Sequence, residues 1–255
     1  MSPPIVRSIG HAASVRVYED FPALSRAAAE EFVGCGRAAI DRRGRFDVAL
    51  SGGSTPRQVY SLLASACAAS LSWEKVHLFF GDERHVPPDD PQSNYRMVAE
   101  SLLANGAIGA VPHRIEAELP AEEAANRYEQ EIRRHFEAPP PAQPRFDLIL
   151  LGLGTDGHTA SLFPNTTALE EKVRSVVANS VPQLRTERIT LTFPALNQAR
   201  HILFLASGPD KAPVLAEVLG NAKGKHAYPS MSVRPVDGEL VWMIDAAAAA
   251  QFMKS

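Results

Sequence analysis

Short runs of consecutive hydrophobic residues recur along the chain, and each run ends in glycine or polar residues. The clearest runs are Phe46–Leu50, Val76–Phe80, Phe146–Leu151 and His201–Ala206. Uninterrupted hydrophobic runs of this length are typical of strands that are buried on both faces of a sheet. Arg188–Phe193 alternates between polar and hydrophobic residues, and Leu240–Ile244 is again hydrophobic, so we expect a strand at each.

Segments with helical spacing of their hydrophobic residues lie between these runs. They are Leu24–Ile40, Pro56–Ala69, Ser93–Ala104 and Ala121–Phe136. Strands that alternate with helices predict an α/β fold with a mainly parallel sheet. The proline-rich stretch Ala138–Pro144 is a candidate linker, but we predict one domain over residues 1–255. In such folds ligands bind in the loops beyond the carboxyl ends of the strands.

Composition and charge narrow the class of protein. Lys plus Arg is 26 and Asp plus Glu is 29 in 255 residues, a formal net charge of −3, which argues against a general nucleic-acid binder. Cys35 and Cys67 form no CxxC pair, which favours a reducing compartment. Residues 1–16 do not resemble a signal peptide, and no hydrophobic stretch is long enough to span a bilayer. We therefore expect a cytoplasmic protein with no nucleic-acid or membrane partner, and we favour a monomer.

The first loop with candidate chemistry, residues 51–56, follows the strand predicted at Phe46–Leu50. Gly52 and Gly53 let the backbone approach a ligand closely, and Ser54 or Thr55 could cap the next helix. Free N–H groups and hydroxyls at a helix N-terminus favour an anion such as phosphate. The alternative is a plain strand–turn–helix junction, and the Walker pattern is absent.

The second loop, Gly81–Pro87, places two carboxylates, a guanidinium and an imidazole directly after a strand. Arg84 could bind a phosphate or a carboxylate in a bidentate manner, with Asp82 or Glu83 orienting it. The alternative is a solvated turn with a surface ion pair. Ser93-Asn94, further along, favours a cap of the next helix.

The third loop, Gly152–Pro164, opens with a match to GxGxxG. Dinucleotide binding would need a full helix after it, and Pro164 interrupts one, so we reject that function. His158 lies two residues after Asp156, and a histidine oriented by a carboxylate is the usual arrangement of a general base. A structural histidine is the alternative, and spacing alone does not decide whether Asp156 contacts His158 or the substrate.

Two further cations lie near the predicted strands, and several catalytic patterns are absent from the chain. Arg188 and Lys211 could each complete an anion site or lie at the surface. The chain has no GxSxG, no HExxH and no cysteine in these loops, so it indicates neither a covalent nucleophile nor a metal. The residues thus indicate acid–base chemistry on a phosphorylated small molecule, without naming it.

The ordered set of segments resembles the 6-phosphogluconolactonase family over nearly the whole chain. The matching segments are LSGGSTP (50–56), GDERHVP (81–87), PQSNYRM (91–97), GLGTDGHTASLFP (152–164), RITLTFPALNQAR (188–200), SGPDKA (207–212) and YPSMSVRP (228–235). Phe80 stands where relatives often carry Trp, and we expect no consequence for the chemistry.

The resemblance implies a Rossmann-like fold with a mainly parallel central sheet flanked by helices, as in the glucosamine-6-phosphate isomerases. It implies hydrolysis of 6-phospho-D-glucono-1,5-lactone in the oxidative pentose phosphate pathway, with no metal or cofactor. His158 would activate water and Asp156 would be its polar partner. The residues expected to bind the substrate and its phosphate are Gly52, Gly53, Ser54, Thr55, Asp82, Arg84, Arg188 and Lys211.

Two other functions remain open at this point. Glucosamine-6-phosphate isomerase (deaminase) activity would use the same phosphate loop, although the loops around Arg84 and His158 resemble the lactonases better. A non-catalytic phosphosugar-binding module is the second alternative, and such a module would not need His158 or Asp156.

Overall fold

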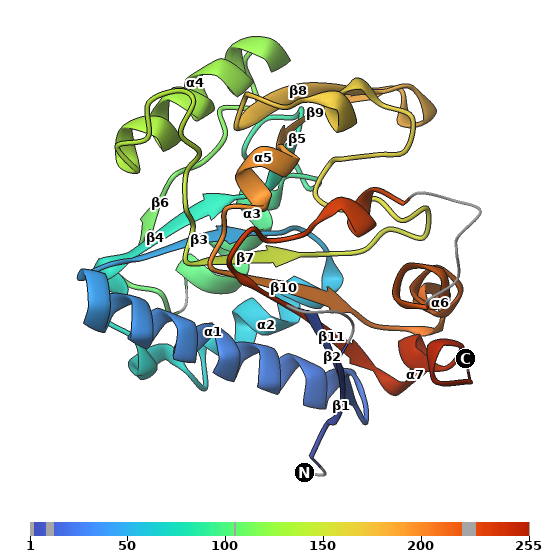
Figure 1. Ribbon diagram of the computed structural model, residues 1–255. Coiled ribbons are helices and arrows are strands. Elements are labelled where there is room, and N and C mark those ends of the chain that lie inside the picture. The colour runs from blue at the N-terminus through green and yellow to red at the C-terminus, as the bar shows by residue number, and fades with distance from the viewer. Residues whose placement is uncertain (1–2, 9–12, 105, 221–227, 255) are drawn as a thin grey trace.

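A large parallel sheet forms the centre of the computed structural model, which describes residues 3–8, 13–104, 106–220 and 228–254 (Figure 1). Its strand order is β1-β2-β11-β10-β7-β3-β4-β6, and every neighbouring pair is parallel except β1 and β2. In this order the strands are β1 (Ile5–Ser8), β2 (Ala13–Tyr18), β11 (Glu239–Asp245), β10 (His201–Ala206), β7 (Leu148–Leu151), β3 (Phe46–Leu50), β4 (Val76–Phe80) and β6 (Val111–Pro112).

The four hydrophobic runs form four adjacent strands of this sheet, β10, β7, β3 and β4, so this prediction and the mainly parallel α/β fold are confirmed. β3 and β7 are buried along their whole length, and β4 is buried except at His77, as expected for strands covered on both faces. β7 begins at Leu148, and Asp147 just before it is tied to β3: its N–H donates to the Asp47 carbonyl at 2.9 Å, and its carboxylate accepts from the Asp47 N–H at 3.0 Å. The sequence patterns did not predict β1, β2 or β6.

Helices cover both faces of the sheet (Figure 1). α1 and α2 pack together on one face, and α4 lies on the other side with a second, smaller sheet. The helices are α1 (Phe21–Arg43), α2 (Ser54–Ala64), α3 (Asn94–Val98, continued by a π-helical turn at Ala99–Leu103), α4 (Ala121–His135), α5 (Phe193–Leu196), α6 (Ala212–Leu219) and α7 (Ala246–Ala249). One-turn 3-10 segments lie at Ala68–Ser70, Trp73–Lys75, Thr167–Glu170, Pro182–Leu184, Pro209–Lys211, Pro229–Ser232 and Phe252–Lys254.

The ends of α1 have clear local causes. The Asp20 carboxylate caps its first turn by accepting from the Ala23 N–H at 2.7 Å. Gly44 ends it in the left-handed conformation, with φ 77°, and its N–H donates to the Ile40 carbonyl. Between these ends, alanines and Phe32 form the buried side of the helix.

The smaller sheet is antiparallel, with the order β5-β9-β8. Its strands are β5 (Asp82–Arg84), β9 (Thr186–Leu191) and β8 (Val176–Val181). Gly81 is the crossing point from one sheet to the other, because its N–H donates to Leu50 of β3 and its carbonyl accepts from the Leu191 N–H of β9, both at 2.8 Å. The residues after β4 therefore run into a second sheet and do not form the turn that the sequence suggested.

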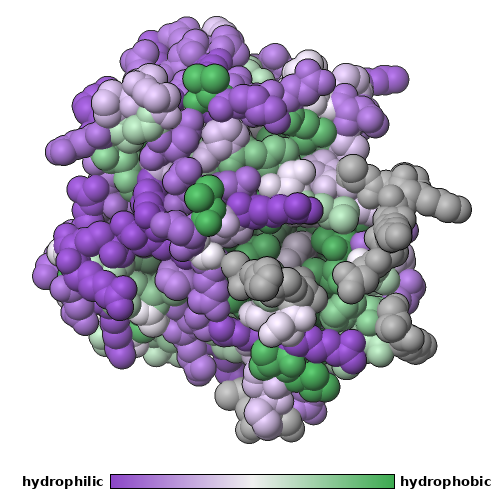
Figure 2. Space-filling model, viewed as in Figure 1, coloured by the Kyte–Doolittle hydropathy of each residue, from purple (hydrophilic) through white to green (hydrophobic). Residues whose placement is uncertain are grey.

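The buried hydrophobic residues form one connected cluster that includes members from both sheets. α4 is tied to β4 by Tyr128, whose buried hydroxyl accepts from the Phe80 N–H at 2.7 Å and donates to the Phe80 carbonyl at 3.0 Å. The face shown in Figure 2 is mainly hydrophilic, with a hydrophobic patch at the end where β1 lies. In the described ranges, no helix has the length and hydrophobicity to cross a membrane.

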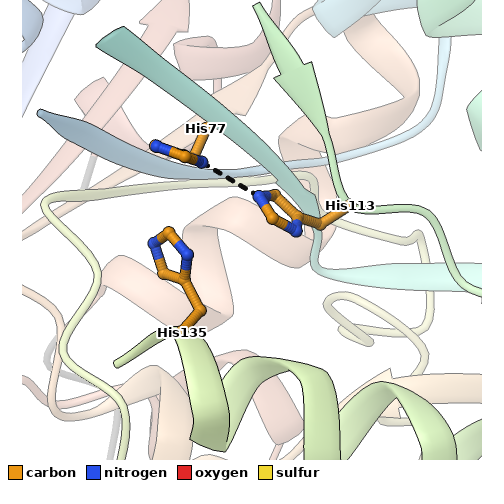
Figure 3. A group of neighbouring side chains, drawn as sticks. All are labelled: His77, His113 and His135. Atoms are coloured by element: carbon orange, nitrogen blue, oxygen red, sulfur yellow. Dashed lines mark hydrogen bonds between the residues drawn. The ribbon is translucent and has the colours of Figure 1, made fainter. Parts of the chain in front are cut away.

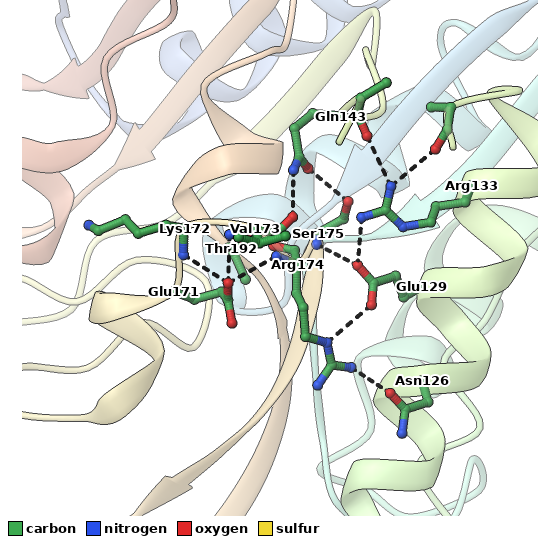
Figure 4. A network of polar contacts seen from close by, with 12 residues as sticks. Asn126, Glu129, Arg133, Gln143, Glu171, Lys172, Val173, Arg174, Ser175 and Thr192 are labelled. Atoms are coloured by element: carbon green, nitrogen blue, oxygen red, sulfur yellow. Dashed lines mark hydrogen bonds and ion pairs between the residues drawn. The ribbon is translucent and has the colours of Figure 1, made fainter. Parts of the chain in front are cut away.

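A network of polar contacts joins α4 to the chain that enters β8 (Figure 4). Glu129 on α4 is its centre: its carboxylate accepts from the Ser175 N–H at 2.7 Å, from Arg133 at 3.0 Å and from Arg174 at 3.1 Å. The Arg174 guanidinium also binds Glu122 and Asn126. Hydrogen bonds to charged groups of low exposure are worth more than surface ion pairs, so this network helps to hold the small sheet in place.

We expect Glu129→Ala to lower the thermal midpoint by about 5–10 °C, because the variant leaves two largely buried guanidinium groups and one N–H short of an acceptor. Thermal unfolding followed by circular dichroism measures this. Glu123→Ala is the matched control, since Glu123 lies on the same helix and, among the described residues, its ion pair is with the exposed Arg127. Equal losses in the two variants would show that the network contributes nothing beyond an ordinary surface pair.

Candidate active site

The three loops singled out from the sequence follow β3, β4 and β7, which are neighbours in the large sheet. Because the three strands are parallel, the loops leave from the same edge. The structure therefore places these loops together, as the sequence analysis expected for a ligand site in this class of fold.

The first loop ends directly in α2. The helix begins at Ser54, and Gly53, with φ 109°, occupies the cap position without any side-chain hydrogen bond. The expectation that Ser54 or Thr55 caps the helix is therefore wrong, because the helix starts one residue earlier. Both hydroxyls remain uncommitted to capping, and the N–H groups of this first turn have no intrahelical acceptor. Gly53 and Ser54 are exposed, so the N–H groups at the start of the helix can face an anion in solvent.

The second loop is held by its own buried carboxylates. Glu83 accepts from the backbone N–H groups of Asn94 at 2.7 Å, Tyr95 at 2.8 Å and Arg84 at 2.8 Å. Burial raises the pKa of Glu83 even though these donors oppose the shift. Ser93 caps α3, as expected, by accepting from the Arg96 N–H at 3.2 Å.

Asp82 connects all three loops. Its carboxylate accepts from Ser161 Oγ of the third loop at 2.6 Å and from Asn94 Nδ2 at 3.3 Å. The oxygen of the same Asn94 amide lies against Gly52 of the first loop, where an added Cβ would come within 1.9 Å of it. Gly52 is therefore required for close packing, and Asp82, 7% exposed, is placed to position the loops.

Two arginines lie side by side where the small sheet faces the loops. Arg84 of β5 and Arg188 of β9 are direct partners in the antiparallel register. Like charges opposite each other destabilise a sheet unless something neutralises them. Burial lowers the pKa of Arg188 below its ordinary value, and the positive charge of Arg84 lowers it further. Arg84 donates to the Gln92 carbonyl at 2.5 Å, and Arg188 donates to Thr186 Oγ1 at 3.1 Å. No carboxylate of the described residues forms an ion pair with either guanidinium.

His158 and Asp156 form a direct pair in the third loop. Nδ1 of His158 lies 2.5 Å from the Asp156 carboxylate, and the His158 N–H donates to the same oxygen at 3.2 Å. The structure thus answers the question that spacing left open: Asp156 contacts His158. With the proton of the neutral ring on Nδ1, facing the carboxylate, Nε2 carries a lone pair.

The surroundings of His158 fix the plane of its ring. Phe163 stacks on the imidazole with centroids 4.0 Å apart, and a Cβ on Gly154 would come within 2.1 Å of Nδ1. Gly157, with φ 75°, packs on Tyr228 and allows the tight turn between Asp156 and His158. The His158 side chain is still 29% exposed, so the ring is held but accessible.

The GxGxxG match does not open a helix. Residues 152–166 form turns and an isolated bridge between Thr159 and Leu162, and none of these residues is helical. This agrees with the rejection of a dinucleotide site, since the phosphate-binding helix of that motif is missing.

Lys211 lies after β10, the neighbour of β7, in the 3-10 turn that leads into α6. Its ammonium group is 3.0 Å from the Asp210 carboxylate, and no contact joins it to the other predicted site residues in the described ranges.

Motif reasoning missed the positioning roles of Asn94 and Ser161, although both lie in matched segments. It also missed Asn179 of β8, whose amide donates to the Ser161 carbonyl at 2.8 Å.

A cavity of about 630 Å³ opens at the opposite, amino edge of the large sheet and is also lined by arginines. There, however, Arg43 pairs with Asp147 at 2.5 Å and Arg145 pairs with Asp237 at 2.6 Å. Arg200 also lies 3.3 Å from Asp147, so three of the four arginines of this cavity pair with a carboxylate, whereas Arg84 and Arg188 have no such partner among the described residues. The edge with the three loops is therefore the better candidate for an anionic ligand.

Comparisons with known proteins show the family of the chain. The family model described as glucosamine-6-phosphate isomerases/6-phosphogluconolactonase matches residues 19–242. A 6-phosphogluconolactonase of Nostoc sp. is 42% identical over 216 residues, which are 84% of this chain and 87% of the relative. The solved 6-phosphogluconolactonase of Trypanosoma cruzi is 30% identical with a TM-score of 0.85, covering 96% of this chain and 98% of that one.

A more distant solved structure shares the fold. A monomeric glucosamine-6-phosphate deaminase, 20% identical, superposes with a TM-score of 0.75 over 93% of this chain and 99% of its own. At that identity the likeness concerns the fold alone. The match over most of the sequence and the relatives above show that the chain belongs to the glucosamine-6-phosphate isomerase/6-phosphogluconolactonase family.

Proposed function

We propose that this protein is a 6-phosphogluconolactonase, which hydrolyses 6-phospho-D-glucono-1,5-lactone to 6-phosphogluconate in the oxidative pentose phosphate pathway. The names of relatives at 36–42% identity over most of the chain support the activity. The observation that carries the proposed mechanism is the His158–Asp156 pair, because it offers an oriented, accessible base where a family member needs one.

In the proposed mechanism His158 activates water. Nε2 removes a proton from the water while its oxygen attacks the lactone carbonyl carbon, and Asp156 stabilises the imidazolium that forms. The tetrahedral intermediate then collapses, the bond between the carbonyl carbon and the ring oxygen breaks, and the imidazolium returns its proton to that oxygen. The product is the open-chain acid, and no covalent intermediate with the protein forms.

The phosphate end is proposed to bind between the start of α2 and the arginine pair. The N–H groups and hydroxyls of Ser54 and Thr55 would donate to the phosphate, with Gly52 and Gly53 allowing its close approach. Arg84 and Arg188 would bind the remaining oxygens, which would also relieve their mutual repulsion. Lys211 is a further candidate contact. Asp82 is assigned to positioning the loops, because Ser161 and Asn94 already occupy its carboxylate.

We expect the wild type to open the lactone ring faster than the spontaneous background, and His158→Ala to lose about 10²–10⁴-fold in kcat while staying folded. The lactone is generated in situ by glucose-6-phosphate dehydrogenase, and the background is subtracted. His201→Ala is the control, since His201 lies at the amino end of β10 beside Glu239. Normal turnover by His158→Ala would remove His158 from the mechanism.

If the wild type does not accelerate ring opening, ammonia release from glucosamine 6-phosphate tests the deaminase alternative.

Arg84→Ala and Arg188→Ala should each raise KM for the phosphorylated lactone by about 10–100-fold, the loss expected for charge-assisted hydrogen bonds. Neither should change KM for unphosphorylated glucono-1,5-lactone. Arg96→Ala serves as control, because this arginine is partly exposed and its side chain donates to Glu100 and to the Asp89 carbonyl in the described part of the chain. An equal effect on both lactones would mean that the pair does not bind phosphate.

A further inference from the structure

Three histidines converge at the amino end of β4, at the edge of the sheet opposite the candidate active site (Figure 3). His77 lies on β4, His113 directly follows β6, and His135 is the last residue of α4. One ring nitrogen of each lies within 4.8 Å of one nitrogen of each of the others. The proposed hydrolysis uses none of them.

Carboxylates orient two of the three rings. Glu131 lies 2.6 Å from Nδ1 of His113, and Asp47 lies 2.7 Å from Nε2 of His135. Each carboxylate keeps the proton on the nitrogen that it contacts, so Nε2 of His113 and Nδ1 of His135 carry lone pairs. A histidine whose outer N–H donates to a carboxylate is the usual arrangement around a protein-bound metal ion.

The third ring completes the set. Nδ1 of His77 lies 3.0 Å from Nε2 of His113, and because the latter carries a lone pair, His77 donates the single proton between them. A metal ion can replace this proton if the His77 proton moves to Nε2. Tetrahedral zinc needs its nitrogen ligands about 3.3 Å apart, so the His77–His113 distance of 3.0 Å fits, and His135, which lies within 4.8 Å, must approach by at most about 1.5 Å.

Charge and access also suit a cation. Asp47 and Glu131 carry two negative charges, and Arg45, which pairs with Asp47 at 2.9 Å, carries one positive charge. His113 and His135 are 13% and 12% exposed, so the rings are held but remain open to solvent on one side. Phe79 stacks on His113 with centroids 4.2 Å apart and restricts its rotation.

We propose that His77, His113 and His135 form a binding site for one divalent transition-metal ion of the zinc type. Imidazole nitrogens select such ions over Mg²⁺ and Ca²⁺, and three histidines leave a fourth position for water. The ion would join β4, the segment after β6 and the end of α4. Its role would be to stabilise the fold, away from the proposed hydrolysis.

The test is calorimetric titration of the metal-free full chain with Zn²⁺, repeated with Mg²⁺. The expected result is one Zn²⁺ per chain with a dissociation constant below roughly 10 µM, and no binding of Mg²⁺. At a free zinc concentration of 100 times the dissociation constant, the thermal midpoint should rise by about 5–10 °C. Co²⁺ should show the visible absorption of a four-coordinate ion.

Variants separate this site from other histidines. His77→Gln and His135→Gln should each lose the bound Zn²⁺, whereas His201→Gln, which alters a histidine outside the cluster, should keep it. Glu131→Gln leaves all three ligands in place and should weaken binding about 10–100-fold. Lactone turnover and circular dichroism check that each variant is folded. If a histidine variant does not fold, the zinc affinity of Glu131→Gln still tests the proposal. Absence of Zn²⁺ binding by the wild type, or equal binding by the wild type and the cluster variants, would overturn the proposal.

Discussion

One buried carboxylate, that of Asp82, holds the candidate active site together. It accepts hydrogen bonds from Ser161 in the third loop and from Asn94, which in turn packs on Gly52 in the first. Burying a charge is costly unless hydrogen bonds compensate it, so a carboxylate in this position fixes the distances between the segments that donate to it. The loop with the proposed base and the loop with the proposed phosphate donors are thereby held in one arrangement before any substrate binds.

The second constraint is the antiparallel register of the small sheet. It sets Arg84 directly opposite Arg188, an arrangement that favours an anion between or above them and is unfavourable without one. The network around Glu129 anchors β8, and β8 pairs along its whole length with the strand that carries Arg188. Stability of the small sheet and the position of the arginines are therefore linked, although α4 contributes no residue to the proposed substrate site.

The sequence was sufficient for the parts of the structure that depend on local pattern. The four hydrophobic runs predicted four adjacent strands of the large sheet, because strands buried on both faces need uninterrupted hydrophobic residues. The spacing of Asp156 and His158 suggested an oriented base, but it left open whether Asp156 contacts His158 or the substrate, and the folded loop brings the two side chains together. β5 could not be predicted, since three charged residues carry no strand pattern and are placed by pairing with β9, about a hundred residues later. The same holds for the contact of Asn94 with Gly52 and for the histidine cluster, whose members come from three separate elements.

The central claim is that Arg84 and Arg188 act together on one phosphate, and a double-mutant cycle on binding of the product tests it most directly. Affinity for 6-phosphogluconate would be measured by calorimetry for the wild type, Arg84→Ala, Arg188→Ala and the double variant, with gluconate as the ligand without phosphate. If the two arginines share one phosphate, each single variant weakens binding at least about tenfold, and the double variant departs from the sum by roughly 0.5–3 kcal/mol. Single variants that bind 6-phosphogluconate as tightly as the wild type would contradict the account.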